Sequence, residues 1–300
     1  MYHADRPLNM PARLLQPGWF GCALTLMLAL GLGCAASVRP TKHAVVTPVT
    51  PPAPSFDVER PFVVPGEVIA WDLTYLGVTG GFAQLAVGEP GTLGSRRVVA
   101  MRAEARTIGL AAVVKRIEDL STSWVDLDSG LPLRSEADAQ FGARHLEVAT
   151  TWLAAERRID QRLRIDHGRE QRRLRVLPDA RVHDALSSLL VLRAWRAPAG
   201  EHATLTSLGG QRLWRTELVA AGRTEVDGPL GERSAFRIDG TAWRLRTDHS
   251  IDPTRPPRTF SVWISDDADR IPLRVVASTE LGDVTISATA YTVGARVGAR

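Results

Sequence analysis

Histidine and acidic side chains are the groups in this chain that could hold a metal ion or transfer protons. Seven histidines are present, but none has the short spacing to a second histidine that marks a zinc-binding helix. Those in the folded part are His145, His167, His183, His202 and His249. They fall on different expected elements. Folding could still bring some of them together, yet the spacing predicts no metal site and no cofactor.

The run Asp248-His249-Ser250 contains the three residue types of a hydrolase triad. Neighbouring residues on a strand point to opposite faces, so this run cannot relay a proton. The chain also lacks the Gly-x-Ser-x-Gly turn that presents a nucleophilic serine. We therefore expect a protein that is not an enzyme.

Two acidic clusters, Asp126-x-Asp128 and Asp266-Asp267-x-Asp269, have carboxylates that could bind calcium. Neither has the full loop of oxygen ligands with its distant glutamate. Hairpin turns are the simpler interpretation, because Asp side chains there accept hydrogen bonds from their own backbone.

An expected hairpin rich in arginine is the most prominent charged feature. Alternation with a period of two places several guanidinium groups on one face of a strand pair. The candidate face for an anion or a protein partner comprises Arg158, Arg162, Arg164, Arg172 and Arg175. Phosphorylated headgroups or an acidic protein would suit it. Alternatively, these charges only keep a sheet edge soluble, with Asp160 and Glu170 pairing with them.

One helix is predicted in the folded part, over residues 183–196. Leu186, Leu189 and Leu190 recur at helical spacing and indicate an amphipathic helix. Asp184 is suited to cap the amino end, because its carboxylate can accept a free backbone N–H. We expect this helix to plug a large sheet.

Most of the remaining residues between 59 and 293 have the pattern of short strands separated by turns of Gly, Asp or Pro. Many strands with short connections favour an antiparallel meander. We therefore expect a mainly β domain, built as a large curved antiparallel sheet or roll with one central helix. Its tryptophans could line a ligand cavity, although tryptophan is more commonly a core residue.

Two stretches of the expected domain resemble each other. Residues 124–134 and 263–274 each contain a tryptophan near a strand end, an acidic turn, and a Pro-Leu-Arg start to the next strand. The similarity suggests two related half-sheets, 60–180 and 200–293, on either side of the helix. Chance similarity between two hairpins is the alternative.

The amino-terminal residues 1–33 have the layout of a secretory signal peptide. Basic residues precede an apolar run of roughly 14 residues, which is too short to cross a bilayer comfortably. The sequence that ends at Cys34 resembles the lipobox of bacterial lipoproteins, so Cys34 is the expected lipid attachment site. An ordinary signal peptide with an incidental cysteine is the alternative, and Met10 is an alternative start.

Residues 34–58 comprise the expected anchor cysteine and a Pro-rich tether, and residues 294–300 form a tail. The folded part has no cysteine, because Cys22 and Cys34 are the only two in the chain. This excludes a disulfide framework and a cysteine-bound metal there. The net charge of +4 comes almost entirely from arginine, but an exported chain is not expected to bind nucleic acid.

Several motifs together resemble the bacterial envelope family known as domain of unknown function 3108. They are Pro65-Gly66-Glu67, Trp124-x-Asp126 with Leu131-Pro132-x-Arg134, Asp184-x-Leu186-Ser187 with Leu192-Arg193, and Val262-Trp263-Ile264-Ser265-Asp266 with Pro272-x-Arg274. The hairpin motif is also similar to that of periplasmic lipoprotein carriers, which are curved sheets that cover an apolar cavity. The resemblance implies an envelope protein but no particular activity.

These expectations combine into one hypothesis and one alternative. The first is an envelope lipoprotein, anchored at the outer membrane through Cys34 and facing the periplasm. It would bind or carry an apolar ligand, such as a lipid or acyl chain. The alternative is a structural or assembly protein that contacts an envelope partner through its Arg-rich surface. A periplasmic or secreted location is the alternative to anchoring.

Overall fold

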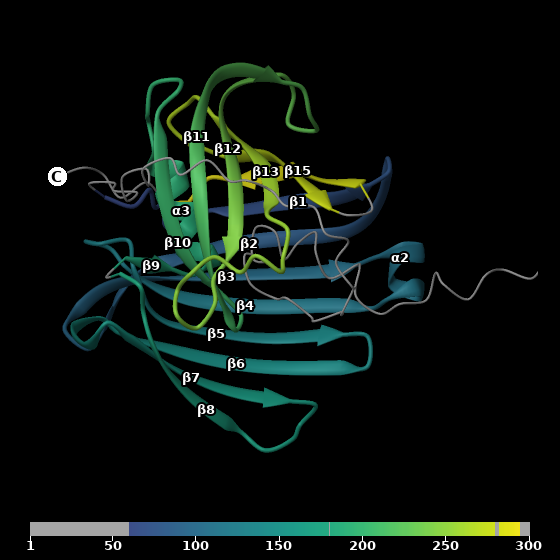
Figure 1. Ribbon diagram of the computed structural model, residues 1–300. Helices are drawn as coiled ribbons and strands as arrows, with labels where there is room; N and C mark the ends of the chain where they lie inside the picture. The colour runs from purple at the N-terminus through teal and green to yellow at the C-terminus, as the bar shows by residue number, and fades with distance from the viewer. Residues whose placement is uncertain (1–59, 180, 280–281, 295–300) are drawn as a thin grey trace, which may run out of the picture.

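The computed structural model describes residues 60–179, 181–279 and 282–294. Their strands form one sheet of 15, in the order β8-β7-β6-β5-β4-β3-β2-β1-β15-β14-β13-β12-β11-β10-β9. Figure 1 shows this sheet curving around helix α3 (Ala185–Ala194). The prediction of a mainly β fold with a large curved antiparallel sheet and a central helix is confirmed. The expected signal peptide, Cys34 and the tether lie outside the described residues.

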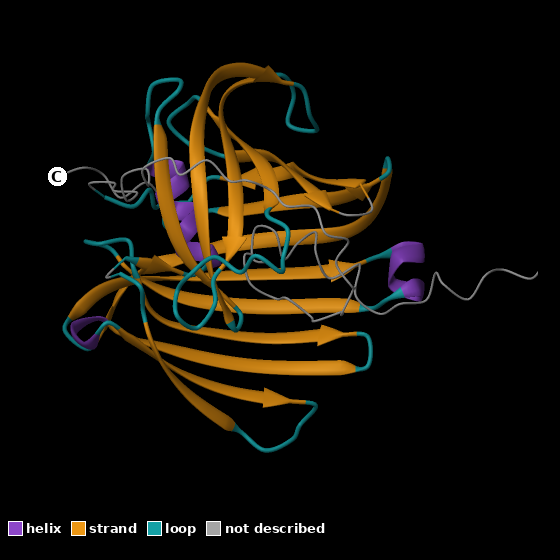
Figure 2. Ribbon diagram, in the orientation of Figure 1, coloured by secondary structure: helices purple, strands orange, loops and turns teal. Residues whose placement is uncertain are grey.

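Strands dominate the molecule, as Figure 2 shows. Consecutive strands from β1 to β8 and from β10 to β15 pair antiparallel, and so do β1 and β15, whereas β9 pairs parallel with β10. Strands β8 and β9 are the two edges of the sheet. The strands are β1 (Val68–Tyr75), β2 (Val78–Leu93), β3 (Arg96–Thr107), β4 (Ile117–Asp126), β5 (Pro132–Phe141), β6 (Arg144–Leu153), β7 (Arg158–Ile165), β8 (Gln171–Val176), β9 (Val182–His183), β10 (His202–Gly209), β11 (Arg212–Val226), β12 (Arg233–Arg244), β13 (Arg258–Ser265), β14 (Pro272–Thr279) and β15 (Gly282–Thr292).

Helix α3 is shorter than the predicted 183–196, because His183 belongs to strand β9, but Asp184 caps it as expected. Asp184 Oδ1 accepts the backbone N–H of Ser187 at 2.8 Å, and Ser187 Oγ accepts that of Asp184 at 3.0 Å. The predicted amphipathic character is wrong, because every residue from Ala185 to Arg193 is buried. The sheet surrounds the helix, and a helix enclosed in this way needs no polar face.

The two stretches that resemble each other form hairpins of the same register. Trp124 pairs with Arg134 across β4 and β5, and Trp263 pairs with Arg274 across β13 and β14. In both hairpins the register shifts directly after the tryptophan. This agreement extends the sequence similarity to the backbone, whereas the division into two half-sheets stays a prediction.

The acidic clusters are hairpin turns, as the sequence favoured. Asp126 Oδ1 accepts the backbone N–H of Ser129 at 2.8 Å, and Asp267 Oδ1 accepts that of Arg270 at 3.0 Å. Burial opposes ionisation of Asp126, but hydrogen bonds from Arg96 and Ser129 hold its pKa at about 2. These carboxylates are therefore occupied in shaping turns.

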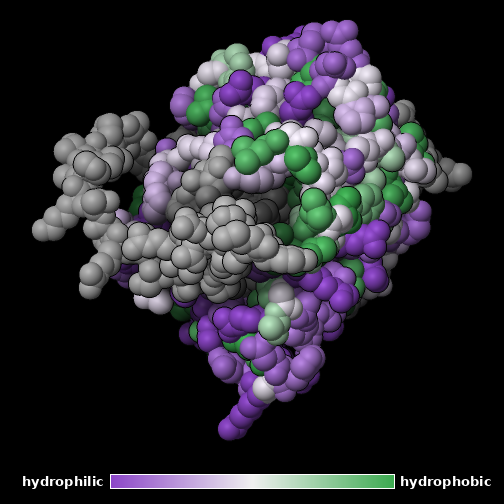
Figure 3. All heavy atoms as spheres, turned by 90° about the vertical axis from the view of Figure 1, so that its right-hand side faces the viewer, coloured by the Kyte–Doolittle hydropathy of each residue, from purple (hydrophilic) through white to green (hydrophobic). Residues whose placement is uncertain are grey.

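A short helix that the sequence did not reveal, α2 (Gly109–Val114), connects β3 to β4. Its three large aliphatic side chains are exposed, with exposed fractions of 82% for Leu110, 83% for Val113 and 67% for Val114. Figure 3 views the side of the molecule that carries α2 in Figure 1 and shows hydrophobic side chains on this face. Six residues are too few for a periodicity to be recognised in the sequence.

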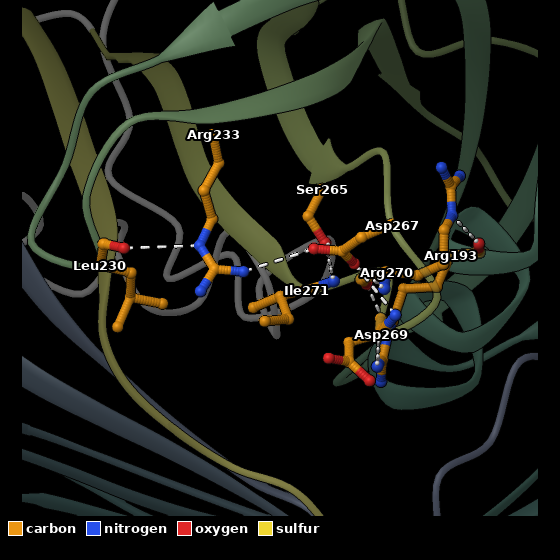
Figure 4. Close-up of polar contacts among 8 residues, drawn as sticks. All are labelled: Arg193, Leu230, Arg233, Ser265, Asp267, Asp269, Arg270 and Ile271. Carbon is orange, nitrogen blue, oxygen red and sulfur yellow. Dashed lines mark hydrogen bonds and ion pairs between the residues drawn. The ribbon is translucent and has the colours of Figure 1, made fainter.

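Two buried arginines hold the carboxyl end of α3 inside the sheet. Arg193 and Glu67 have fully buried side chains and form a two-bond ion pair, with Arg193 Nη2 2.9 Å from Glu67 Oε2. Arg270 Nη2 donates to the main-chain oxygen of Trp195 at 2.8 Å. Figure 4 shows Arg193 beside the turn between β13 and β14, which carries Asp267, Asp269 and Arg270.

Candidate functional site

Small side chains line the inner face of the sheet from β2 to β6. Strand pairing aligns them in two neighbouring rows that cross the sheet. One row contains Ala83, Ala105, Asp119, Ala139 and Leu146, and the other contains Leu85, Ala103, Ser121, Ala137 and Val148. Alanine and serine fill little of the space between the sheet and α3. A half-open cleft with a cavity of about 70 Å³ therefore remains over β4, β5 and β6.

The opposite wall of this cleft comes from distant parts of the chain. Ala185 and Leu186 supply it from the first turn of α3, and Leu208 supplies it from β10. Trp152 of β6 closes one side, and its indole Nε1 is buried without a hydrogen-bond partner among the described residues. The cleft is thus apolar over much of its surface but has an unused donor at its edge.

A third row of inner-facing residues makes the end of the cleft away from Asp119 polar. Ser123, Ser135, Thr150 and Gln161 follow one another across β4, β5, β6 and β7. Ser123 Oγ donates to Asp184 Oδ2 at 2.5 Å. Gln161 Nε2 donates to Thr150 Oγ1 at 3.2 Å and to the Gly210 carbonyl at 2.8 Å. The cleft therefore combines an alanine-lined channel with a hydrogen-bonding end.

Two buried carboxyl groups face the cleft and have perturbed pKa values. Burial raises the pKa of Asp119 to about 6, although a hydrogen bond from Ser121 opposes the shift. Burial also raises the pKa of Asp184, against hydrogen bonds from Ser123 and Ser187. None of the described residues that line the cleft is histidine, cysteine or lysine. This lining can accept or donate hydrogen bonds, but it lacks the imidazole base of a Ser-His-Asp triad.

A second, smaller cavity of about 20 Å³ continues along the same inner face, between α3 and strands β1 to β3. Trp71, Ala83, Ala103 and Leu189 are among its lining residues. Pockets that enclose whole small molecules measure about 300–1,000 Å³. Because α3 fills the centre of the sheet, these two cavities cannot enclose a whole lipid as carrier cavities do.

Four of the five candidate arginines share one outer face, and the fifth does not. Arg162 of β7 lies directly opposite Arg172 of β8, on the exposed side of the strands. Arg175 instead lies opposite the buried Ile159 and donates to the Gln211 carbonyl. Burial lowers the pKa of Arg175. The sequence-based assignment of Arg175 to the shared face is therefore wrong.

Most guanidinium groups on this outer face have carboxylate partners. Arg172 Nη2 lies 2.8 Å from Asp160 Oδ2, Arg164 Nη1 lies 3.1 Å from Glu147 Oε2, and Arg158 Nη1 lies 3.7 Å from Glu156 Oε2. Arg162 is the fourth arginine on this face and lies opposite Arg172. Paired charges of this kind favour the interpretation as a soluble sheet edge, because little uncompensated charge is left to attract an anion.

Exposed aliphatic side chains form a projection at one end of the sheet, which we term the apolar tip. It comprises Leu76 and Val78, with exposed fractions of 74% and 66%, and Leu110, Val113 and Val114 of α2. The backbone N–H of Ile108 donates to the Gly80 carbonyl at 3.0 Å and joins the two parts. Arg106, Lys115 and Arg116 flank the tip in the sequence. None of the described helices has the length and hydropathy to cross a bilayer.

Sequence reasoning missed most residues of the cleft. It identified Asp184 only as a helix cap, and it treated Trp152 only as one of several tryptophans. The available signal was the alternation of Ala and Ser at every second position of β3, β4 and β5. This pattern can be recognised as the floor of a cleft only when the strand register shows that the small residues are neighbours.

One family model matches most of the described chain. It is described as "Protein of unknown function (DUF3108)" and matches residues 70–289. The chain matches none of the curated proteins with which it was compared.

Solved structures of similar proteins are distant in sequence. A beta-barrel-like protein of domain of unknown function DUF1849 from Brucella abortus is 11% identical, with a TM-score of 0.50, and the match covers 78% of this chain and 99% of that one. A protein from Bacteroides fragilis described as exported, with a YmcC-like fold, is 10% identical, with a TM-score of 0.37 and coverage of 78% and 100%. A protein from Parabacteroides distasonis described as a lipoprotein is 8% identical, with a TM-score of 0.29 and coverage of 80% and 99%. Only the first match reaches a TM-score of 0.50, and at 11% identity it shows a similar fold alone.

Proposed function

The chain belongs to the DUF3108 family, whose description assigns no activity, and from the geometry we propose that it is an envelope lipoprotein that binds an acyl-chain ligand. The observation that carries this proposal is the floor of small side chains beneath α3, which leaves an apolar cleft ending in hydroxyl and carboxyl groups. The proposed location in the cell envelope rests on the lipobox-like sequence at Cys34. No catalytic step is part of the proposal.

The cleft suits part of an acyl chain rather than a whole lipid. A methylene chain lying over Ala137 and Ala139 would contact Leu186 on its other side, because these residues line opposite walls. The head of the ligand would meet Ser123 and Asp184, which offer hydrogen-bond donors and acceptors at the polar end of the cleft. Since the cleft is half-open, the remainder of the ligand would lie against the outer rim.

The apolar tip gives the cleft a route to a membrane. Gly81 pairs with Thr107 at the tip end of β2 and β3, and Ala83 pairs with Ala105 two residues further along the same strands. The alanine rows therefore begin one step from the tip. Aliphatic side chains entering the acyl region, with Lys115 beside anionic headgroups, would place the opening of the cleft at the membrane surface.

Filling the cleft tests this proposal. Ala137→Phe adds a ring on the inner face of β5, and Ala149→Phe adds the same ring on the outer face of β6, where Ala149 lies opposite Glu136. Binding of a fluorescent fatty acid to each full-length variant would be measured by titration. We expect Ala137→Phe to weaken binding by at least tenfold and Ala149→Phe to leave it unchanged.

Native mass spectrometry of protein purified from its own envelope, followed by lipid extraction, provides the second readout. A lipid that copurifies with the parent protein and with Ala149→Phe, but not with Ala137→Phe, would support the proposal. Equal probe affinity in all three proteins, or a parent protein that binds no fatty acid, would contradict it.

A further inference from the structure

Two histidines and a glutamate that are separated in the sequence meet near the edge of the sheet. One ligand atom from each of His145, Glu147 and His167 lies within 4.8 Å of the other two. The two imidazole rings are tilted by 33°, with their centroids 4.5 Å apart. The wide spacing of these histidines in the sequence predicted no metal site. His145 is the second residue of β6, whereas His167 belongs to the turn between β7 and β8.

His145 is oriented as a metal ligand would be. Its Nε2 lies 2.6 Å from Asp138 Oδ1. When Nε2 carries the proton and donates to Asp138, the lone pair is on Nδ1. Nδ1 is buried without a hydrogen-bond partner among the described residues, and it lies 3.8 Å from Glu147 Oε1. A histidine that ligates a metal commonly donates its other N–H to a carboxylate in this way.

The other two ligands are also held in place. Arg164 Nη1 donates to Glu147 Oε2 at 3.1 Å, which leaves Oε1 on the side of His145. His167 is placed by its neighbour Asp166, which makes two 2.8 Å hydrogen bonds with the main chain of His145. One of these is donated by His145 N–H to Asp166 Oδ1, and the other by Asp166 N–H to the His145 carbonyl.

We propose that His145, Glu147 and His167 bind a divalent transition-metal ion of the zinc class, with water completing the coordination. Two imidazoles and one carboxylate suit Zn²⁺, whereas Ca²⁺ and Mg²⁺ prefer oxygen ligands. Metal–ligand bonds of 2.0–2.1 Å require ligand atoms about 3.3 Å apart. Small side-chain rotations of exposed His167 and half-buried Glu147 would close the cluster to that spacing.

This metal site is independent of the acyl-binding cleft. His145 and Glu147 occupy the outer face of β6, whereas the intervening Leu146 lines the cleft on the inner face. A bound ion would join the β7–β8 turn to β6. The edge hairpin of the sheet would thereby gain a crosslink that the hydrophobic core does not supply.

Isothermal titration of metal-stripped full-length protein with zinc chloride tests the site. We expect saturable binding that weakens at least tenfold in His167→Ala, which alters an exposed turn residue. Asp138→Asn should weaken zinc binding by about 10- to 100-fold through loss of the orienting carboxylate. The matched control His202→Ala removes another exposed histidine, at the start of β10, and should leave the affinity unchanged.

Two further readouts separate ligation from a change of fold. Zinc should raise the melting temperature of the parent protein but not that of His167→Ala, while the two proteins melt alike without metal. Co²⁺ in place of zinc should give the intense visible absorption of a four-coordinate site. The proposal is overturned if the parent shows no saturable zinc binding, or if His167→Ala and His202→Ala bind zinc equally well.

Discussion

Arg193 and Arg270 each donate Nε to the other's main-chain carbonyl oxygen, at 2.9 Å and 2.8 Å. Arg193 comes from the last turn of α3, and Arg270 from the turn between β13 and β14, so the exchange ties helix to hairpin. Arg270 also satisfies the carbonyl of Trp195, and cations are favoured near the carboxyl end of a helix. Burial and the nearby Arg196 lower the pKa of Arg270 to about 10.

Replacing Arg193 by methionine should destabilise the protein strongly. The variant leaves Glu67 buried without its partner, and breaking a buried ion pair in this way costs about 3–5 kcal/mol. The free energy of unfolding in urea measures the loss. Arg116→Met removes an ion pair whose side chains are 67% and 49% exposed, and it should cost less than about 1 kcal/mol. Similar losses in the two variants would refute the structural role of the buried pair.

The motifs that made the sequence recognisable contact one another in the fold. Glu67 belongs to the Pro-Gly-Glu motif and bonds Arg193 of the Leu-Arg motif, 126 positions away. The sequence could predict α3 and its Asp184 cap, because helical periodicity and capping are local. It could not predict that α3 is buried on all sides, since this depends on how far a sheet of 15 strands curves. Those motifs therefore maintain the architecture.

Functional geometry was less predictable because it depends on strand register. Period-two alternation correctly placed Arg158, Arg162 and Arg164 on one face of β7. It failed for Arg175, because the register of β8 aligns that residue with the inner face, where the Gln211 carbonyl accepts its hydrogen bond. The alanine rows and the His145 cluster likewise depend on pairings between strands. Composition and spacing do not contain that information.

Asp119 should make stability fall as pH rises. Its folded-state pKa is about 6 against the ordinary 3.8, so between these values the folded state holds more protons than the unfolded state. This contribution, roughly 3 kcal/mol in size, is complete below pH 3.8 and is lost as pH rises above 6. Asp119→Asn should therefore be more stable than the parent at pH 8, with the advantage vanishing near pH 3.5.

Urea unfolding across this pH range checks the sign of the Asp119 effect. Asp248→Asn is the control, because hydrogen bonds from Ser250 lower the pKa of Asp248. A lowered pKa stabilises the fold above the unfolded-state value and loses this effect as pH falls. The two substitutions should thus change the pH dependence in opposite directions. A stability difference between Asp119→Asn and the parent that did not vary with pH would contradict the burial argument.

Two substitutions of Asp184 should distinguish its role as a helix cap from the effect of its charge. Asp184→Ala removes the acceptor for Ser187 N–H and for Ser123 Oγ, and loss of a helix cap costs about 0.5–2 kcal/mol. Asp184→Asn keeps a capping oxygen without a buried charge, so it should remain closer to the parent in urea unfolding at pH 8. Asparagine behaving as badly as alanine would show that the carboxylate charge, rather than the cap, is required.

The apolar tip should determine membrane affinity when the lipid anchor is absent. Cys34→Ser removes the expected acylation site, so that vesicle cosedimentation of this protein reports the folded domain. In this background, Leu110→Ser with Val113→Ser should weaken binding to anionic phospholipid vesicles by more than tenfold, because a fully buried aliphatic side chain contributes about 1.5–3 kcal/mol. Rising salt should weaken binding by the unsubstituted tip, since Lys115 attracts the headgroups.

The chain offers a matched pair of exposed aliphatic residues away from the tip. Leu174 and Val176 of β8 are each 56% exposed, and Leu174→Ser with Val176→Ser removes the same kind of surface. This control should bind vesicles as well as the Cys34→Ser parent does. If both double variants lose binding equally, the contact depends on general surface hydrophobicity rather than on the projection formed by α2 and the β1–β2 turn.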